Sequence, residues 1–277
     1  MPWIERGRPR CQQGFTLIEA VMAIAITGVV ITVVSVFIVP ATNAYFASAQ
    51  RAQLGDQADT ALRRITRDLA QALPNSARVS PSGLSLELIP VSGAARYAVN
   101  TAAALQFGVA PIPTFAIIGP PLRLSGANQK LAWFNLGPAT PDADAYTLNN
   151  VRTASTAAGN AASVTITGAA LPNALQAPPY RVYAIESPVT YRCDLTARTL
   201  TRYSGYGFLS NQPDPPAGGS SAVLARNVDS CKFGFDPAAV AARYALVTLQ
   251  LALQDKGADT NGEIVSLYHA VHVDNLP

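Results

Sequence analysis

The chain has 277 residues, of which 49% are hydrophobic and 13% are charged, and this length is enough for a membrane segment and one sizeable domain. Many stretches alternate apolar and polar residues, which excludes an intrinsically disordered chain. The formal net charge is only +3, and Arg6, Arg8 and Arg10 less Glu5 supply +2 of it. No basic patch therefore remains to indicate a nucleic-acid partner.

The amino-terminal region consists of a short basic leader that ends at Gly14 and an apolar run that continues to about Ala41. Between Gly14 and Arg51 only Glu19 is charged. At a helical rise of ~1.5 Å per residue, Ala20–Ala41 would span roughly 33 Å, about one bilayer core. A carboxylate in such a segment costs on the order of 2.5–3.5 kcal/mol in hydrocarbon, so Glu19 needs a functional reason.

The stretch Gly14-Phe15-Thr16-Leu17-Ile18-Glu19 resembles the class III signal of the type IV pilin and pseudopilin superfamily. The resemblance implies that residues 1–14 are a prepilin leader. A prepilin peptidase would cut between Gly14 and Phe15 and methylate the new amino terminus. Glu19 would then meet the Phe15 ammonium of a neighbouring subunit in a filament. Desolvation offsets much of the attraction in such a pair, so its clearer benefit is the register of assembly.

The implied partners are the prepilin peptidase, other major and minor pilins in a filament or tip complex, and the pilus assembly platform in the inner membrane. The three arginines of the leader keep the amino terminus in the cytoplasm by the positive-inside rule. We therefore expect a single-pass protein of the bacterial inner membrane with a periplasmic head, which later reaches a pilus at the cell surface.

Two other interpretations of the amino terminus remain open. A plain signal anchor would hold a periplasmic binding module that does not polymerise, but such an anchor has no need of Glu19. A cleaved secretory signal would show a small-residue cleavage site after its apolar core, and the residues up to Ala44 offer only a poor one.

We expect one long helix over residues 15–73, with 15–41 in the membrane or filament core and 42–73 packed on the head. Pro40 lacks the amide hydrogen that an interior helical residue donates, so it should kink the helix or loosen the turn before it. Pro74 should end the helix, because proline biases the preceding residue away from helical angles. One apolar stripe should pack on a sheet, and it consists of Leu54, Ala58, Ala61, Ile65 and Leu69.

Beyond the helix we expect a variable connecting region over 74–179 and an antiparallel sheet over 180–277. The first region shows only short strand-like pieces between stretches rich in Gly, Pro, Asn and Ala. The second shows clear alternating runs, which should form a meander with one face on the helix stripe. These runs are Arg181–Glu186, Val189–Asp194, Leu200–Tyr203, Cys231–Phe235, Val247–Gln254 and Ile264–Val273. The predicted fold class is α+β, a long amino-terminal, partly transmembrane helix packed on an antiparallel β-sheet head, as in type IV pilins.

The cysteines fit an oxidising compartment. Cys11 would leave with the leader, so the mature chain keeps an even pair, Cys193 and Cys231. We expect a disulfide between them, which would close a loop of about 38 residues and stabilise the fold by about 3–4 kcal/mol in the chain-entropy model. Two buried free thiols are the alternative, and a zinc site is disfavoured because neither cysteine has a second ligand at the required spacing.

Four stretches resemble the minor pilins of the mannose-sensitive haemagglutinin (MSHA) pilus in particular, namely Leu73–Ser76, Val189–Asp194, Arg202–Gly207 and Tyr268–Pro277. This resemblance implies a minor pilin that acts in pilus assembly or initiation, or at the filament tip. The sizeable head favours the tip over the shaft, because a bulky subunit packs badly in a repeating lattice. The alternatives within the superfamily are the larger minor pilins of type IVa pili and the J-type minor pseudopilin of type II secretion systems.

We find no constellation of catalytic residues and predict that the protein is not an enzyme. No G-x-S-x-G, P-loop or H-E-x-x-H motif occurs. His269 and His272 lie three apart on a predicted strand and so on opposite faces, where we expect one inside and one at the surface. A possible sugar-binding patch, for which we expect a packing role instead, consists of Tyr203, Tyr206 and Phe208 with Arg202.

One weak metal candidate lies in the polar loop before the last alternating run. Oxygen ligands at Asp259, Asn261 and Glu263 could hold calcium. The spacing is too short for an EF-hand loop, and Asn-Gly is a hairpin signal in its own right. We therefore expect no cofactor unless calcium binds there.

Overall fold

The computed structural model of the protein describes residues 14–110, 114–126, 128–240, 244–255 and 262–277. The chain divides into two units, one ending at Gln50 and one spanning Arg51–Pro277, which we call the head. Of the expected leader over residues 1–14, all but Gly14 lies outside the described residues.

The first element is a helical run that comprises α1 (Leu17–Val33), a π-helical turn (Val34–Ile38) and α2 (Val39–Ala70). The π-helical turn ends two residues before Pro40, as expected for a residue that cannot donate to the carbonyl four positions earlier. The helix ends three residues before the predicted Leu73, because the amide of Leu73 donates instead to the carbonyl of Ile89, at 2.7 Å.

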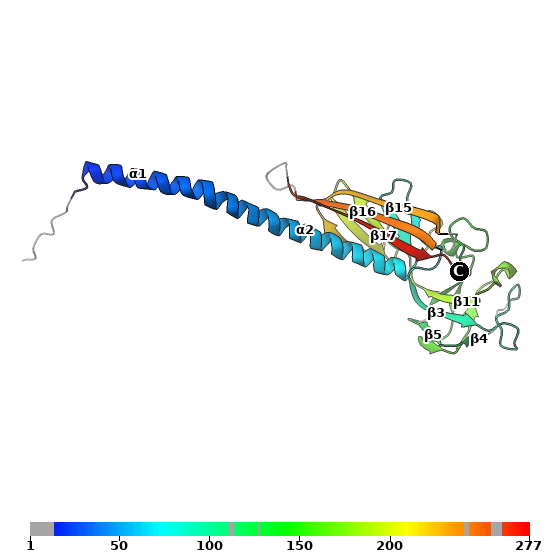
Figure 1. Ribbon diagram of the computed structural model, residues 1–277. Coiled ribbons are helices and arrows are strands. Elements are labelled where there is room, and N and C mark those ends of the chain that lie inside the picture. The colour runs from blue at the N-terminus through cyan, green and yellow to red at the C-terminus, as the bar shows by residue number, and fades with distance from the viewer. Residues whose placement is uncertain (1–13, 111–113, 127, 241–243, 256–261) are drawn as a thin grey trace, which may run out of the picture. The chain divides into compact units, whose positions relative to one another are not determined.

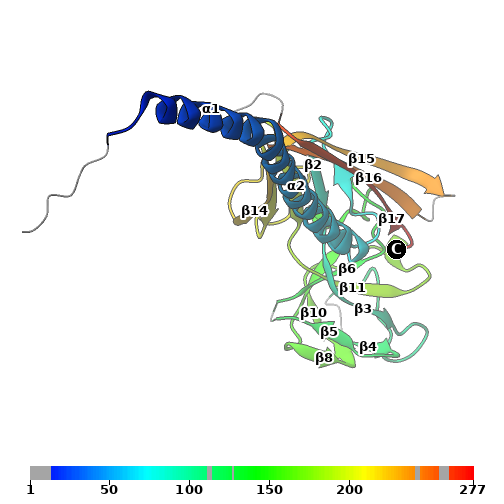
Figure 2. The same cartoon turned by 60° about the vertical axis from the view of Figure 1, so that its left-hand side comes forward.

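The predicted apolar stripe of α2 forms the centre of the main core of the head. All five of its members are buried, together with Leu62. They pack against a five-stranded sheet in the order β1 (Arg78–Val79), β2 (Ser85–Leu88), β12 (Val189–Asp194), β13 (Thr199–Ser204) and β14 (Ser220–Arg226). They also pack against a three-stranded sheet of β15 (Val228–Val240), β16 (Tyr244–Gln254) and β17 (Ile264–Asp274), whose strands lie side by side in Figures 1 and 2. All pairings are antiparallel.

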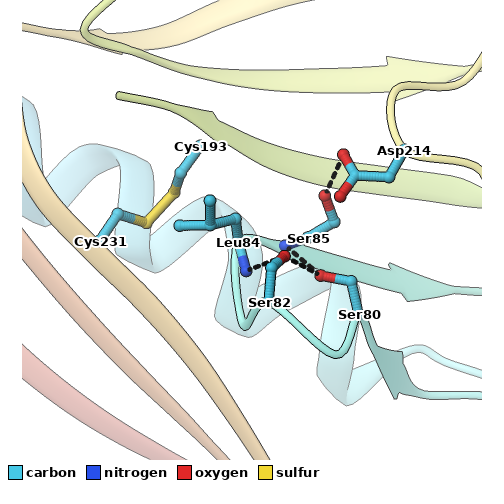
Figure 3. The surroundings of a disulfide bond; sticks show 7 residues. All are labelled: Ser80, Ser82, Leu84, Ser85, Cys193, Asp214 and Cys231. Atoms are coloured by element: carbon cyan, nitrogen blue, oxygen red, sulfur yellow. Dashed lines mark hydrogen bonds between the residues drawn. A yellow bond between two sulfur atoms is a disulfide. The ribbon is translucent and has the colours of Figure 1, made fainter. Parts of the chain in front are cut away.

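The predicted disulfide between Cys193 and Cys231 is present and joins the two sheets, because Cys193 lies on β12 and Cys231 on β15. Their Cα atoms are 6.2 Å apart. Figure 3 shows the turn that precedes β2 beside this bond. In that turn, the carbonyl of Gly83 accepts from the amide of Phe233 on β15, and the carbonyl of Leu84 accepts from the amide of Cys193. The turn and the disulfide therefore hold the same two strands together.

A second group of strands lies between β2 and β12 in the sequence, and we call residues 89–188 the insert. Its seven-stranded sheet has the order β10 (Ile166–Thr167), β7 (Val151–Ala154), β6 (Lys130–Trp133), β11 (Arg181–Ile185), β3 (Val91–Tyr97), β4 (Phe115–Ile118) and β9 (Ser163–Val164). A small sheet of β5 (Leu122–Leu124) and β8 (Gly159–Ala161) and two 3-10 turns (Ala145–Thr147 and Asn173–Leu175) complete it.

The insert has a hydrophobic core of its own, which includes Tyr97, Phe115, Trp133 and Val182. Its two ends are neighbours, since Leu88 pairs with Val189 across β2 and β12. The predicted single meander is therefore divided among three sheets. β11 belongs to the insert, because its partners are β3 and β6 and not β12.

The end of α2 and the insert share a third cluster of buried side chains, which includes Leu73, Ile89, Tyr146 and Ile185. The hydroxyl of Tyr146 donates to the carbonyl of Ser76 at 2.7 Å. These contacts bury the polar connection between helix and strands, which explains why the region after Pro74 is ordered despite its weak strand pattern.

Candidate functional site

The start of α1 is fixed by a reciprocal pair of residues, Thr16 and Glu19. Thr16 has extended backbone angles (φ −79°, ψ 150°), and its Oγ1 accepts a hydrogen bond from the Glu19 amide at 3.3 Å. The Glu19 carboxylate accepts from the Thr16 amide at 3.1 Å and from the Thr16 hydroxyl at 3.0 Å. This is a capping box, which satisfies amide groups that the first helical turn leaves without partners. The helix therefore begins at Leu17 and not at Phe15.

The capping box also decides where the carboxylate of Glu19 lies. Gly14, Phe15, Thr16 and Glu19 line one hollow at the amino-terminal end of the helix, so the acid lies beside the bond at which cleavage is expected. Both Phe15 and Glu19 are exposed. A carboxylate that already accepts two hydrogen bonds can still accept from an incoming ammonium, because it has about four lone-pair sites.

Thr16 is the functional residue that the sequence prediction missed. We expected Glu19 to act only between subunits, whereas the structure gives it a partner in its own chain. The spacing Thr-x-x-Glu before an apolar run is the signal that could have revealed this pair.

The surface of α1 is apolar on every side. Its residues are all exposed, and they include large apolar side chains from Leu17 through Val33. The hydroxyls of Thr27 and Thr32 donate to carbonyls of the same helix, at 2.7 and 2.8 Å, so they present no unpaired donor. The continuous helical run Leu17–Ala70, which includes α1, is long and apolar enough to cross a membrane, and a helix that is hydrophobic all round belongs in lipid or in a protein core.

The candidate calcium site stays a prediction. Asp259 and Asn261 lie outside the described residues. Glu263 forms two hydrogen bonds with the guanidinium of Arg51, each at 2.9 Å, so its oxygens already have a cationic partner. Within the described ranges no three His, Cys, Asp or Glu side chains form a group that could hold a metal ion.

His269 and His272 lie on β17 and point to opposite faces of the sheet, as the strand period requires. The expectation that one would be inside is wrong, because both are exposed. β17 is an outer strand of its sheet, so only one of its sides is covered by a neighbouring strand.

The candidate sugar-binding side chains are used for internal contacts. The Tyr206 hydroxyl donates to Glu87 at 2.7 Å and lies 2.6 Å from the Thr190 hydroxyl. Arg202 pairs with Asp68 at 3.1 Å. Phe208 is half-buried against the cluster that the insert shares with the helix end.

A buried ion pair ties the loop after β13 to the main sheet. Arg78 Nε donates to Glu87 Oε2 at 2.6 Å, and the Glu87 side chain is completely buried. The same guanidinium donates to the carbonyls of Leu209 and Ser210, at 2.9 and 2.6 Å. Burial raises the pKa of Glu87, and the hydrogen bond and charge of Arg78 oppose that shift. These groups are each satisfied by their neighbours, so we assign them a structural role.

A family model described as the prokaryotic N-terminal methylation motif matches residues 9–35. No curated protein and no solved structure matches the chain. The motif implies a type IV pilin-like or pseudopilin protein, which is processed by a prepilin peptidase and assembles with other pilins. Together with the apolar helix it indicates a membrane-anchored protein.

Proposed function

We propose that this chain is a minor pilin of a type IV pilus of the MSHA type, most similar to the minor pilin MshO, and that it acts in pilus assembly or initiation or at the filament tip. The observation that carries the proposal is the capping-box acid, Glu19, at the start of an exposed apolar helix inside the matched methylation motif. A simple anchor needs the helix but not the acid.

The proposed mechanism begins with cleavage between Gly14 and Phe15 and methylation of the new amino terminus. Residues 15–41 hold the subunit in the inner membrane, with the head in the periplasm, until the assembly platform draws it into the filament. Incorporation exchanges lipid contacts of α1 for helix packing in the filament core. Glu19 then accepts the Phe15 ammonium of a neighbour, and this pair fixes the register of the added subunit.

The insert supports a tip or initiation role over a shaft role. It adds about one hundred residues, with a core of their own, to the side of the main sheet. A shaft subunit must repeat along the filament with neighbours on all sides, and a bulky addition at each repeat restricts that packing. A subunit at the tip has neighbours on one side only, so it tolerates the insert.

Contacts between the stretches that resemble MSHA minor pilins support the narrower assignment. Val189–Asp194 and Arg202–Gly207 meet because β12 pairs with β13. The side-chain amide of Asn75 donates to the carbonyl of Asn275, at 3.0 Å, and so connects the other two stretches. The four similar stretches therefore form two contacting pairs within one head, which is expected if they are shared for a common structural reason.

The test is to identify what the full chain assembles with. An epitope-tagged chain is captured from sheared surface filaments and from solubilised membranes, and the captured proteins are identified by mass spectrometry. The proposal expects pilins of a type IV pilus, and expects them to be lost with Glu19→Ala but retained with Asp59→Ala, an exposed helix acid of the head.

Recovery with the pseudopilins of a secretion system would replace the pilus assignment with the J-type pseudopilin interpretation. Recovery with no pilin-like protein, in cells that make both filaments, would contradict polymerisation and leave a membrane-anchored binding module.

A further inference from the structure

β17 is the outermost strand of the three-stranded sheet, whose order is β15-β16-β17. Its pairing with β16 is regular over its whole length, from Gln254↔Ile264 to Tyr244↔Asp274, with no shift of register. One side of β17 therefore bonds to β16, and the other side presents a straight row of backbone donors and acceptors.

Natural sheets protect such edges with charged residues, proline, bulges or short strands. β17 has few of these devices: its only charged residue is Asp274 at its last position, it contains no proline, and it is eleven residues long with no shift of register. The other outer strands differ. β15 has register shifts towards both ends and is held against β12 by the disulfide, and β14 is only seven residues long and pairs with a register shift.

The free edge of β17 is accessible in its middle. Tyr268, His269 and Ala270 are exposed in succession, so both faces of the strand are open there. In the described part of the chain, no backbone group of β17 has a hydrogen bond other than those to β16. On the face toward α2, Val265 and Leu267 pack against the main core but remain only half-buried. The margin of the apolar core is therefore uncovered along this edge.

We propose that β17 receives an extended segment of a neighbouring filament subunit, which adds to the sheet as a fourth strand. The inference rests on the proposed assembly function, because assembly is what brings a second pilin-like head to this edge. Strand addition takes its affinity from main-chain hydrogen bonds and its specificity from alternate side chains. The matching segment is uncharged, because the edge is, and places an apolar residue at every second position to cover Val265 and Leu267.

The first test measures amide hydrogen exchange of β17, residue by residue. In the full chain alone, in detergent, alternate amides of β17 face solvent and exchange quickly, while the others donate to β16 and exchange slowly. In the chain isolated within filaments or tip complexes, we expect the fast set to slow by at least about tenfold, since each then donates to the added strand. The amides of β14, the outer strand of the other sheet, are the control.

A gain of protection at every second residue is the signature of strand addition. Equal protection of all residues would show general burial and would overturn the proposal, as would unchanged exchange of β17 in assembled material. Protection of β14 in place of β17 would overturn it as well.

The second test places lysines at the edge, where incoming strands must desolvate them. Ser266→Lys combined with Ala270→Lys changes two exposed positions on β17, and Ser221→Lys combined with Val223→Lys is the matched change on β14. We expect the β17 pair to lower recovery of the chain in filaments by about tenfold or more, and the β14 pair to leave it unchanged. An equal recovery of both variants would contradict the proposal.

Disulfide formation and the urea midpoint of each lysine variant show that the head still folds, and a β17 variant that fails to fold leaves the exchange measurement as the deciding test. The two proposals fail in different ways. If the wild-type chain never enters a filament or tip complex, the assembly function fails and strand addition fails with it. If the chain does enter but β17 lacks the alternate pattern, only strand addition fails.

Discussion

Residues 14–50 and the head differ in where their stabilising contacts come from. In the first unit the contacts are local: a capping box between residues three apart and hydrogen bonds within one helix. Its side chains are almost all exposed, and Phe15 is 85% exposed. In the head the contacts join distant residues, as in the disulfide over 38 positions and the hydrogen bond from Tyr191 to Asp68.

The two units therefore have separate sources of stability. The head buries its own core, and among its described residues only the indole nitrogen of Trp133 and the amide oxygen of Asn150 are buried side-chain polar atoms without a hydrogen-bond partner. The apolar helix leaves its burial to lipid or to other subunits, because isolated apolar surface of this extent is unfavourable in water. Changes in the first unit should therefore alter assembly and leave the stability of the head unchanged. Changes in the head core should first lower the stability of the head and leave assembly unchanged.

The largest effect should come from Glu19→Ala. An ammonium of a neighbouring subunit left unpaired in the filament core costs ~3 to 5 kcal/mol, so incorporation should fall by about a hundredfold or more. The unfolding midpoint of the head should not change. The measurement is the ratio of chain in sheared filaments to chain in membranes. A variant that incorporates normally would show that Glu19 serves only its own helix.

Arg78→Met should destabilise the head by about 3 to 5 kcal/mol, because it leaves the buried carboxylate of Glu87 without its cation. Arg63→Met is the matched control: Arg63 pairs with Asp59 on the exposed face of α2, and such pairs contribute at most about 1 kcal/mol. Urea unfolding of both variants gives the difference. Similar losses of unfolding free energy in the two variants would contradict the claim that burial makes the Arg78–Glu87 pair the stronger one.

Removing the disulfide with Cys193→Ala and Cys231→Ala should lower the free energy of unfolding by about 3 to 4 kcal/mol in the chain-entropy model. The loss should be smaller if the hydrogen bonds of Gly83 and Leu84 hold β12 and β15 together without it. Calorimetry of the variant measures this. A loss below about 1 kcal/mol would mean that the turn alone joins the two sheets.

Thr16→Ala should weaken the start of α1 by about 1 kcal/mol, the usual cost of losing an N-cap, and lower incorporation by about fivefold. Thr16→Ser keeps the hydroxyl and should restore incorporation. Cleavage at Gly14 should proceed in both. If serine fails to rescue, the methyl group of Thr16 matters and the capping account is wrong.

A further effect should be a dependence of the stability of the head on pH. Burial raises the pKa of Glu87 above its ordinary value of 4.5, so the fold favours the protonated form. The stabilisation from this group is fully present below pH 4.5 and declines as the pH rises through the raised pKa. Glu87→Gln stays neutral, so the stability of the wild type relative to this variant should fall over that range. Parallel plots of unfolding free energy against pH for the wild type and Glu87→Gln would contradict the raised pKa of Glu87.

The parts of the structure that could be predicted from the sequence are those with a local cause. The stripe from Leu54 to Leu69 follows from helical periodicity, and the π-helical turn follows from the missing amide of Pro40. The alternating runs of the last hundred residues are strands at nearly the expected positions. The motif at Gly14–Glu19 pointed to the superfamily whose methylation signal the chain matches.

The pairing of those strands could not be predicted, because it depends on contacts between distant residues. Alternation identified the run Arg181–Glu186 as a strand but carries no information on its partners, β3 and β6. The insert was hidden for the same reason: Leu88 and Val189 pair across one hundred intervening residues. The strands of the insert are short, and each contributes only a few side chains to its hydrophobic core.

The most direct test of the central claim, that residue 15 begins a processed assembly subunit, is the mass of the mature amino terminus in cells with and without a prepilin peptidase. We predict a peptide that begins at a methylated Phe15 and disappears in the peptidase mutant, where the leader through Gly14 should remain. An intact leader in wild-type cells, or a cut near Ala44, would contradict the account. The role of Glu19 would then be limited to capping its own helix, and the function would have to be sought in the head alone.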